Sequence, residues 1–175
     1  MKILNFPELR QTYNYDCGAK AAEAVLAYYN TDIREGEIMK LAGTTRAGTP
    51  IKGIVKVMHK HGLKCKVSKM TIDQVKKHIE MNRPVILVLQ AWTNKEKVNW
   101  EKDWIDGHYV VAIGYDRKRI YFEDPSSVLR TYLSYKELTK RWHDVDTDGK
   151  RYINFGIVAY GKDHNYTLEK SLHMD

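Results

Sequence analysis

A cysteine stands at the start of a predicted helix, six residues after a glutamine. Residues 11–18 read Gln-Thr-Tyr-Asn-Tyr-Asp-Cys-Gly, and an Ala-rich segment follows at once. The free N–H groups and the dipole of a helix N-terminus stabilise a thiolate. A glutamine side-chain amide can donate a hydrogen bond to an oxyanion. The spacing therefore makes Cys17 a candidate nucleophile and Gln11 a candidate oxyanion donor.

A cysteine nucleophile needs a base within reach, and that base needs an orienting group. The chain has seven histidines, and His108 is the one that begins the most strand-like run, Tyr-Val-Val-Ala-Ile-Gly-Tyr. The predicted strand 119–123 would pair with this run through a tight turn. In an antiparallel pair the start of one strand lies beside the end of the next, which brings Asp124 beside His108. A carboxylate there would hold the imidazole in the useful tautomer.

Each of these signals also has an ordinary structural explanation. A lone cysteine in an Ala-rich helix is often a small core residue, and Asp-Pro after a strand is often only a turn. A lone histidine on an apolar strand is often a satisfied core residue. The joint order Gln, Cys, His, Asp is much more specific. The second cysteine, Cys65, reads as a buried bystander, and a Cys17–Cys65 disulfide is the competing arrangement that would silence a thiol catalyst.

The elements that must position these residues follow from periodicity and capping signals. Helices are expected at about 17–30, 34–42, 49–62, 71–81 and 134–143. Asp16 is expected to cap the first, and Thr49-Pro50 to open the third with a cap and a proline at the first position. Capping boxes at Thr71–Gln74 and Ser134–Glu137 open the last two. Strands are expected at about 63–68, 84–89, 108–115, 119–123, 129–133 and 152–160.

Helices followed by a mostly antiparallel sheet with inserted helices predict an α+β domain of two packed layers. At 175 residues a single domain, 1–175, is expected. Its helical part would span about 1–62 and its sheet-containing part about 63–160, with a frayed tail at 161–175.

Composition narrows the setting. The chain is 43% hydrophobic and 29% charged, which is ordinary for a globular protein. It contains no apolar stretch long enough to span a membrane and no apolar signal-peptide core at its start. With only two cysteines, a reduced, cytoplasmic setting is favoured over a disulfide framework.

The positive charge is local. Residues 52–77 contain eight lysines and one acid, Asp73, so this segment carries the whole net charge of +7. Lys52, Lys56 and Lys60 recur every four residues, which is typical of a solvated helix face. The segment has no arginine and no aromatic residue to stack on bases, so no nucleic-acid partner is expected.

With these residues in view, the chain resembles the papain-like bacteriocin-processing endopeptidases, the double-glycine leader peptidase family, and most closely their stand-alone relatives. The resemblance covers about residues 6–160. It rests on Gln11 with Asp16-Cys17-Gly18, on Gly107-His108-Tyr-Val-Val-Ala-Ile-Gly-Tyr115, on Glu123-Asp124-Pro125, and on Leu133-Ser-Tyr-Lys-Glu-Leu138 followed by Trp142.

The resemblance implies a papain-like cysteine peptidase fold, with an N-terminal helical lobe packed on a mostly antiparallel sheet. It implies that Cys17 is the nucleophile, His108 the general base and acid, Asp124 the orienting group and Gln11 the oxyanion-hole donor, without a cofactor or metal. The substrate would be a peptide or protein, with small residues before the cleaved bond. Trp92, Trp100 and Trp104 precede His108 and either wall a substrate groove or pack their loop onto the body.

This chain departs from the family pattern in two respects. The best-known members are fused to a membrane span and an ATP-driven transporter module, so here a transporter would be a separately encoded partner. Many stand-alone relatives have Gly-Pro-Ala where this chain has Gly18-Ala19-Lys20. Two other functions stay open: an acyl- or amide-transfer enzyme that uses the same acyl-thioester, and a catalytically silent peptide-binding module.

Overall fold

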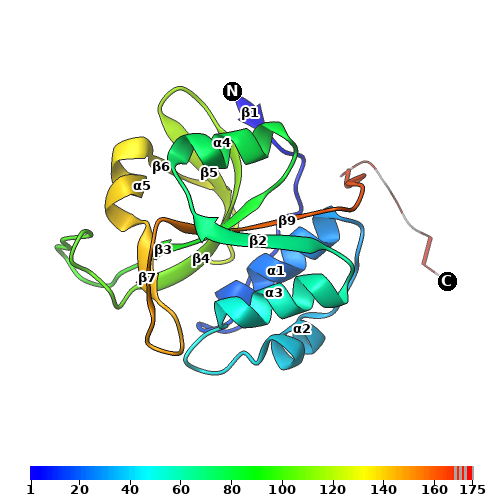
Figure 1. The fold of residues 1–175 in the computed structure, drawn as a ribbon, viewed down its shortest axis with the longest axis horizontal. Coiled ribbons are helices and arrows are strands. Elements are labelled where there is room, and N and C mark those ends of the chain that lie inside the picture. The colour runs from blue at the N-terminus through cyan, green and yellow to red at the C-terminus, as the bar shows by residue number, and fades with distance from the viewer. Residues whose placement is uncertain (168, 170, 172, 175) are drawn as a thin grey trace.

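Five helices are present in the computed structural model, which describes residues 1–167, 169, 171, 173 and 174 (Figure 1). They are α1 Cys17–Tyr28, α2 Glu35–Ala42, α3 Ile51–Lys60, α4 Ile72–Glu80 and α5 Tyr135–Arg141. All five lie where the sequence predicts helices. Part of the tail, for which the sequence predicts fraying, lies outside the described residues.

An antiparallel sheet forms the centre of the molecule. Its strands follow the order β2-β9-β3-β4-β5-β6, and the short β1 also pairs with β4. A separate two-stranded sheet joins β7 and β8. The strands are β1 Lys2–Ile3, β2 Lys64–Lys69, β3 Val85–Gln90, β4 Gly107–Tyr115, β5 Arg119–Glu123, β6 Thr131–Ser134, β7 His143–Val145, β8 Arg151–Ile153 and β9 Phe155–Tyr160.

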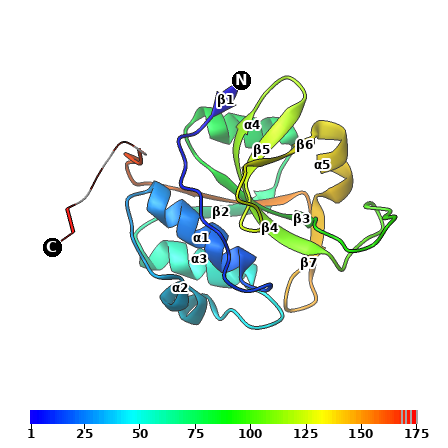
Figure 2. The same cartoon turned by 180° about the vertical axis from the view of Figure 1, so that it is seen from behind.

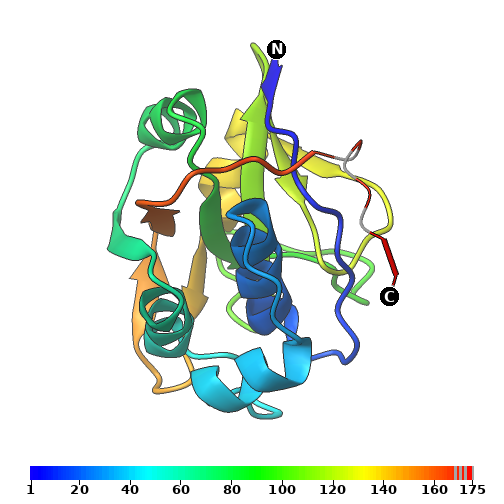
Figure 3. The same cartoon turned by 90° about the vertical axis from the view of Figure 1, so that its right-hand side faces the viewer.

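The helices α1, α2 and α3 form one layer, and α4 and α5 lie at the opposite end near β1 and β6 (Figures 1 and 2). The first helix packs against β4, as the side view in Figure 3 shows. The core between them is built from apolar residues of both layers, such as Val25 and Leu26 of α1 and Val111 of β4, all with no exposed surface. The predicted α+β class, a helical lobe on a mostly antiparallel sheet, is confirmed.

Local capping is predicted correctly at two helices and wrongly at two others. Both capping boxes are present, at Thr71 with Gln74 and at Ser134 with Glu137. Asp16 occupies the N-cap position of α1, but its carboxylate makes no cap hydrogen bond there. At α3 the N-cap residue is Pro50 itself and not Thr49, so the proline lies one residue earlier than predicted.

The C-terminal strands also differ from the prediction. The expected strand 152–160 is two strands, β8 and β9, separated at Asn154, whose φ of 56° interrupts the extended backbone. His143, expected near the end of a helix, instead begins β7. The two-residue strand β1 was not predicted, because such a short segment has no detectable periodicity.

Close packing at Gly18 fixes where α1 begins. A Cβ atom at this position would lie 2.8 Å from Thr49 Cβ and 2.9 Å from Tyr109 Cδ2. Only a residue without a side chain allows the helix to approach β4 and the loop before α3 so closely. Residue 17 is thereby placed where the helical layer meets the sheet.

Candidate active site

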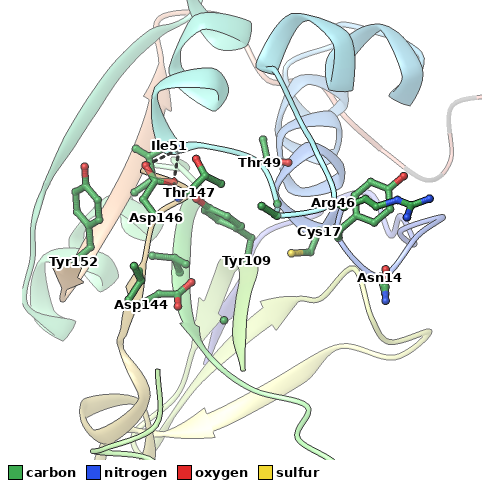
Figure 4. Close-up of a pocket in the computed structure, with 16 residues that line it drawn as sticks. Asn14, Cys17, Arg46, Thr49, Ile51, Tyr109, Asp144, Asp146, Thr147 and Tyr152 are labelled. Atoms are coloured by element: carbon green, nitrogen blue, oxygen red, sulfur yellow. Dashed lines mark hydrogen bonds between the residues drawn. The ribbon is translucent and has the colours of Figure 1, made fainter. Parts of the chain in front are cut away.

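Cys17 is the first residue of α1, and 9% of its surface is exposed. It lies at the wall of a cavity between the helical layer and the sheet (Figure 4). Both cysteines are free, so the alternative of a Cys17–Cys65 disulfide is wrong for this structure. Cys65 lies half-buried on β2, opposite Ala159.

His108 and Asp124 meet through the hairpin geometry expected from the sequence. His108 is the second residue of β4, and Asp124 directly follows β5, which pairs with β4 in antiparallel fashion. The imidazole Nε2 lies 2.7 Å from Asp124 Oδ1, and both side chains are buried. Because Nε2 contacts the carboxylate, Nδ1 is the ring nitrogen left for a second partner.

Each oxygen of the Asp124 carboxylate has two hydrogen-bond partners. The backbone N–H of Ser126 donates to Oδ1 at 2.9 Å, beside His108. The indole Nε1 of Trp92 and the hydroxyl of Thr131 both donate to Oδ2 at 3.1 Å. Burial opposes ionisation, but the hydrogen bond to His108 and these other donors outweigh it and lower the pKa of Asp124. This anchored carboxylate fixes the orientation of the imidazole.

The same contacts act on His108. Burial disfavours the charged imidazolium, but the hydrogen bond to Asp124 and the interaction with the Cys17 side chain raise the pKa of His108 to about 9. The structure therefore brings three of the predicted residues into one interacting series: Cys17, His108 and Asp124. In this arrangement the imidazole is charged at neutral pH and can stabilise a neighbouring thiolate.

Gln11 lies on the Asp124 side of the site. Its backbone N–H donates to Pro125 O at 3.0 Å, and its Oε1 accepts from Ser126 Oγ at 2.9 Å. Its Nε2 donates to Tyr13 O at 2.5 Å. An amide nitrogen carries two hydrogens, so one remains for another acceptor. The backbone N–H of Leu9, two residues earlier, donates a hydrogen bond to Glu123 Oε1 at 2.8 Å.

Asp16 supports the loop before the nucleophile instead of capping the helix. Its Oδ2 accepts hydrogen bonds from the backbone N–H groups of Thr12 and Tyr13, at 3.1 and 3.0 Å. Its Oδ1 and Glu35 Oε1 are both buried without another hydrogen-bond partner in the described chain, and the two carboxyls interact. Lys20 Nζ also lies 3.3 Å from Glu35 Oε1.

These two carboxyl groups titrate as a pair. Burial raises the pKa of Asp16, and the adjacent Glu35 raises it further. For Glu35 the effect of burial is outweighed by hydrogen bonds from Thr12 and Asp16 and by Lys20, which lower its pKa. The two carboxyl groups therefore differ in acidity, and Glu35 ionises more readily than Asp16.

The cavity beside Cys17 has a volume of about 150 Å³. It is lined from the helical layer by the loop before α3 and from the sheet by β3, β4 and the β7–β8 region (Figure 4). Its lining residues are Asn14, Tyr15, Cys17, Arg46, Ala47, Gly48, Thr49, Ile51, Val88, Gly107, Tyr109, Asp144, Val145, Asp146, Thr147 and Tyr152.

Sequence reasoning missed most of this lining. Asp144 and Asp146 are two residues apart across the end of β7, so alternation on a strand would place both on one face. The sequence does not reveal this alternation, because its capping pattern predicts that a helix extends to residue 143, where β7 in fact begins. The contribution of Arg46 and Thr49 depends on how the helical layer packs, and no local pattern reports that.

The three tryptophans before β4 contact the body of the protein. Besides the Trp92 contact with Asp124, Trp100 stacks under the Arg141 guanidinium at 3.9 Å from the ring centroid. Trp104 packs on His143, with ring centroids 4.4 Å apart. None of the three is among the residues that line the described cavity beside Cys17.

The predicted solvated face of the third helix lies at the surface. Lys52, Lys56 and Lys60 lie on the exposed face of α3, as their spacing predicts. In the described part of the chain, no group of three or more His, Cys, Asp or Glu side chains is arranged to hold a metal ion. Among the same residues, no helix has both the length and the apolar character needed to cross a bilayer.

The chain is similar to several known proteins. A family model described as the peptidase C39 family matches residues 5–146. The pediocin PA-1 transport/processing ATP-binding protein PedD of Pediococcus acidilactici is 25% identical over 130 residues, which cover 74% of this chain and 16% of that protein.

Solved structures show the same fold. A C39-like peptidase from Bacillus anthracis superposes with a TM-score of 0.68 at 16% identity, over 94% of this chain and 98% of that one. A double glycine motif protease from an AMS/PCAT transporter, in complex with the leader peptide, gives a TM-score of 0.65 at 19% identity, over 90% and 93%. The chain therefore has the papain-like cysteine peptidase fold.

Proposed function

Because the chain belongs to the peptidase C39 family, we propose that it is a cysteine endopeptidase whose nucleophile is Cys17. The observation that carries the proposal is the series of Cys17, His108 and Asp124 at the edge of a cavity. Thiol catalysis needs a buried imidazole with a raised pKa, placed between a thiol and a carboxylate that hydrogen bonds hold in position.

The proposed reaction gives each of these residues a separate step. The imidazolium of His108 stabilises the Cys17 thiolate, whose sulfur attacks the substrate carbonyl carbon. The π electrons of that carbonyl move to its oxygen, which accepts hydrogen bonds from the backbone N–H of Cys17 and from the remaining Nε2 hydrogen of Gln11. Removal of one such donor costs roughly 3 kcal/mol in other enzymes.

The tetrahedral intermediate then collapses. The C–N bond breaks as His108 gives its proton to the leaving amine, and an acyl-thioester remains on Cys17. A water molecule loses a proton to neutral His108 and attacks the thioester carbonyl. The acid product leaves, and the thiolate–imidazolium pair is restored. Asp124 keeps its charge throughout and holds the ring in place.

The substrate we propose is a peptide or protein segment, with small residues directly before the cleaved bond. The support is the likeness to a protease that carries a leader peptide in its solved complex. The same acyl-thioester would react with an amine to give a transfer product, so product analysis with and without an added amine distinguishes hydrolysis from transfer.

The proposal is tested with purified protein and a library of peptides that contain Gly-Gly. We expect the wild type to cleave members of the library, and Cys17→Ala and His108→Ala to lose at least roughly 1,000-fold in kcat/KM. Cys65→Ala is the matched control and should retain activity. Cleavage that persists in Cys17→Ala would exclude this residue as the nucleophile.

Thiol labelling gives an independent measurement. Burial raises the pKa of the Cys65 thiol to about 11, so at pH 7 it is almost entirely protonated and reacts slowly with iodoacetamide. We expect Cys17 to be labelled much faster, and His108→Ala to remove most of that difference. Equal labelling of the two cysteines in the wild type would contradict an activated Cys17.

A further inference from the structure

The cavity beside Cys17 is large enough for a single side chain. Its volume of about 150 Å³ is comparable to cavities that bind one benzene molecule and well below that of a typical pocket for a drug-sized ligand. Cys17 and Gly107 both belong to its wall, so the cavity opens close to the position of the reacting carbonyl. It is therefore a candidate specificity pocket of the proposed peptidase.

The residues that line the cavity indicate which side of the scissile bond it would bind. His108 must give a proton to the leaving amine, and neither His108 nor Asp124 is among the residues that line the cavity. The amine side of the substrate lies toward His108. The cavity extends instead past Cys17 toward β7, so it faces the acyl side of the substrate.

One carboxylate in this wall, that of Asp144, is held in place by a hydrogen bond but has no lysine or arginine partner among the described residues. Asp144 Oδ1 accepts a hydrogen bond at 2.9 Å from Nε2 of Gln90, a fully buried residue that also donates to His143 O at 3.0 Å. No lysine or arginine of the described residues forms an ion pair with Asp144. A partly buried carboxylate without a lysine or arginine partner is costly, and a cation in the cavity would relieve that cost.

Gly107 makes this position possible. A Cβ atom on residue 107 would lie 2.3 Å from Asp144 Oδ2 and 2.5 Å from Oδ1, so the carboxylate sits directly over the glycine backbone. Gly107 is the residue directly before His108. The charge of Asp144 is therefore presented close to the proposed catalytic residues and not on a remote surface.

The other charged residues of the cavity have different surroundings. Asp146 accepts hydrogen bonds from the backbone N–H of Ile51, at 3.3 and 3.4 Å, and of Thr147 at 2.9 Å, so its charge stabilises the N-terminus of α3. Arg46 is exposed. In Figure 4 it lies with Asn14 on one side of Cys17, whereas Asp144 lies on the other.

We propose that this cavity binds a lysine or arginine side chain on the acyl side of the cleaved bond, and that Asp144 selects it. The inference rests on the proposed peptidase function and names a substrate class for it. Val88, Tyr109 and Tyr152 would cover the aliphatic stem of the side chain, and Asp144 would accept hydrogen bonds from its charged end. A small residue directly before the bond remains compatible with a basic residue further upstream.

The first test compares peptide sets that differ only in one residue before the cleaved bond. Lysine, arginine, glutamine, norleucine or glutamate is placed in turn at each of the preceding positions. For the wild type we expect kcat/KM about tenfold or more higher with lysine or arginine than with glutamine at one position. Asp144→Asn should bring this ratio close to one. Asp148→Asn, an exposed acid near the same strand, should preserve it.

A second test needs no turnover. Peptidyl chloromethyl ketones that carry lysine or norleucine at the selected position alkylate Cys17, and mass spectrometry gives the labelling rate. We expect the lysine reagent to react faster in the wild type but not in Asp144→Asn. Equal rates in the wild type would overturn the specificity assignment. Cleavage without basic preference would do the same while leaving the proposed peptidase intact, whereas selective labelling without any cleavage would refute only the peptidase.

Discussion

At the scale of single residues, the protonation of His108 depends on its two neighbours. Both Asp124 and the Cys17 side chain favour the imidazolium, and together they overcome the effect of burial and raise the pKa of His108 to about 9. An imidazolium is therefore present at neutral pH and is lost only when the pH rises through this value. The activity we propose should decline on the alkaline side for that reason.

Replacement of Asp124 tests this dependence. In Asp124→Ala the buried imidazole loses its main counter-charge, so its pKa should fall and the alkaline limb of kcat/KM should move to lower pH. We also expect kcat/KM at its optimum to fall by roughly 100-fold or more, since the ring is no longer oriented. The measurement is a pH–rate profile of both proteins. An unchanged alkaline limb would show that Asp124 does not set the protonation of His108.

Glu123 gives a separate prediction about stability. Burial raises its pKa to about 7, although Leu9 N–H donates to it. The unfolded chain releases this proton near pH 4.5 and the folded chain near 7, so the residue reduces stability as the pH rises through that window. Glu123→Gln keeps an acceptor for Leu9 and removes the ionisation.

The unfolding free energy of Glu123→Gln relative to that of the wild type should accordingly increase by about 1–3 kcal/mol as the pH rises from 5 to 8. Urea unfolding at the two pH values measures this difference, and the comparison cancels the contributions of other titrating groups. Glu96→Gln, on the exposed loop before β4, serves as the control and should show no such change. A gain that is equal at both pH values would contradict ionisation as the cause.

At the scale of elements, the site depends on how closely α1 approaches β4. Gly18→Ala would place a methyl group 2.8 Å from Thr49 Cβ and 2.9 Å from Tyr109 Cδ2. Neither neighbour has a flexible end to move, so we expect a loss of about 1–3 kcal/mol in unfolding free energy. Gly36→Ala in α2 is the matched control, because a Cβ there meets nothing within 4 Å.

Calorimetry of the two variants checks this pair. Gly36→Ala should be neutral or slightly stabilising, by up to about 1 kcal/mol, because alanine favours the helix more than glycine does. Gly18→Ala should also slow the alkylation of Cys17, which lies next to it at the start of α1. If both variants unfolded alike, close packing would not be the reason for a glycine after the cysteine.

The elements that the sequence predicted well have strong local signals. The capping boxes at Thr71 and Ser134 and the apolar run of β3 are examples. The hairpin of β4 and β5 was predictable because a tight turn fixes the pairing, and it places Asp124 beside His108. Asp16 was predicted wrongly because its side chain bonds to backbone N–H groups that precede the helix, and a propensity for N-caps does not distinguish the two directions.

At the scale of the whole molecule, the cavity lies between segments far apart in sequence. Its wall combines the loop before α3 with β4 and the region around β7, and Asp146 of that region caps α3 through Ile51. Such a surface comes from the docking of two layers, so no window of the sequence contains it. This explains why the contact between His108 and Asp124 was predictable from the sequence, while the contribution of Asp144 to the cavity wall was not.

The strand order has a consequence for synthesis of the chain. Cys17 leaves the ribosome long before β9, but β3 lies between β4 and β9, and β9 ends at residue 160. The sheet that holds His108 can therefore be completed only after residue 160 has emerged, and long-range pairing of this kind forms slowly. Until then a nascent chain would carry the thiol without its proton partner, so the order of synthesis would delay the activity that we propose until β9 has joined the sheet.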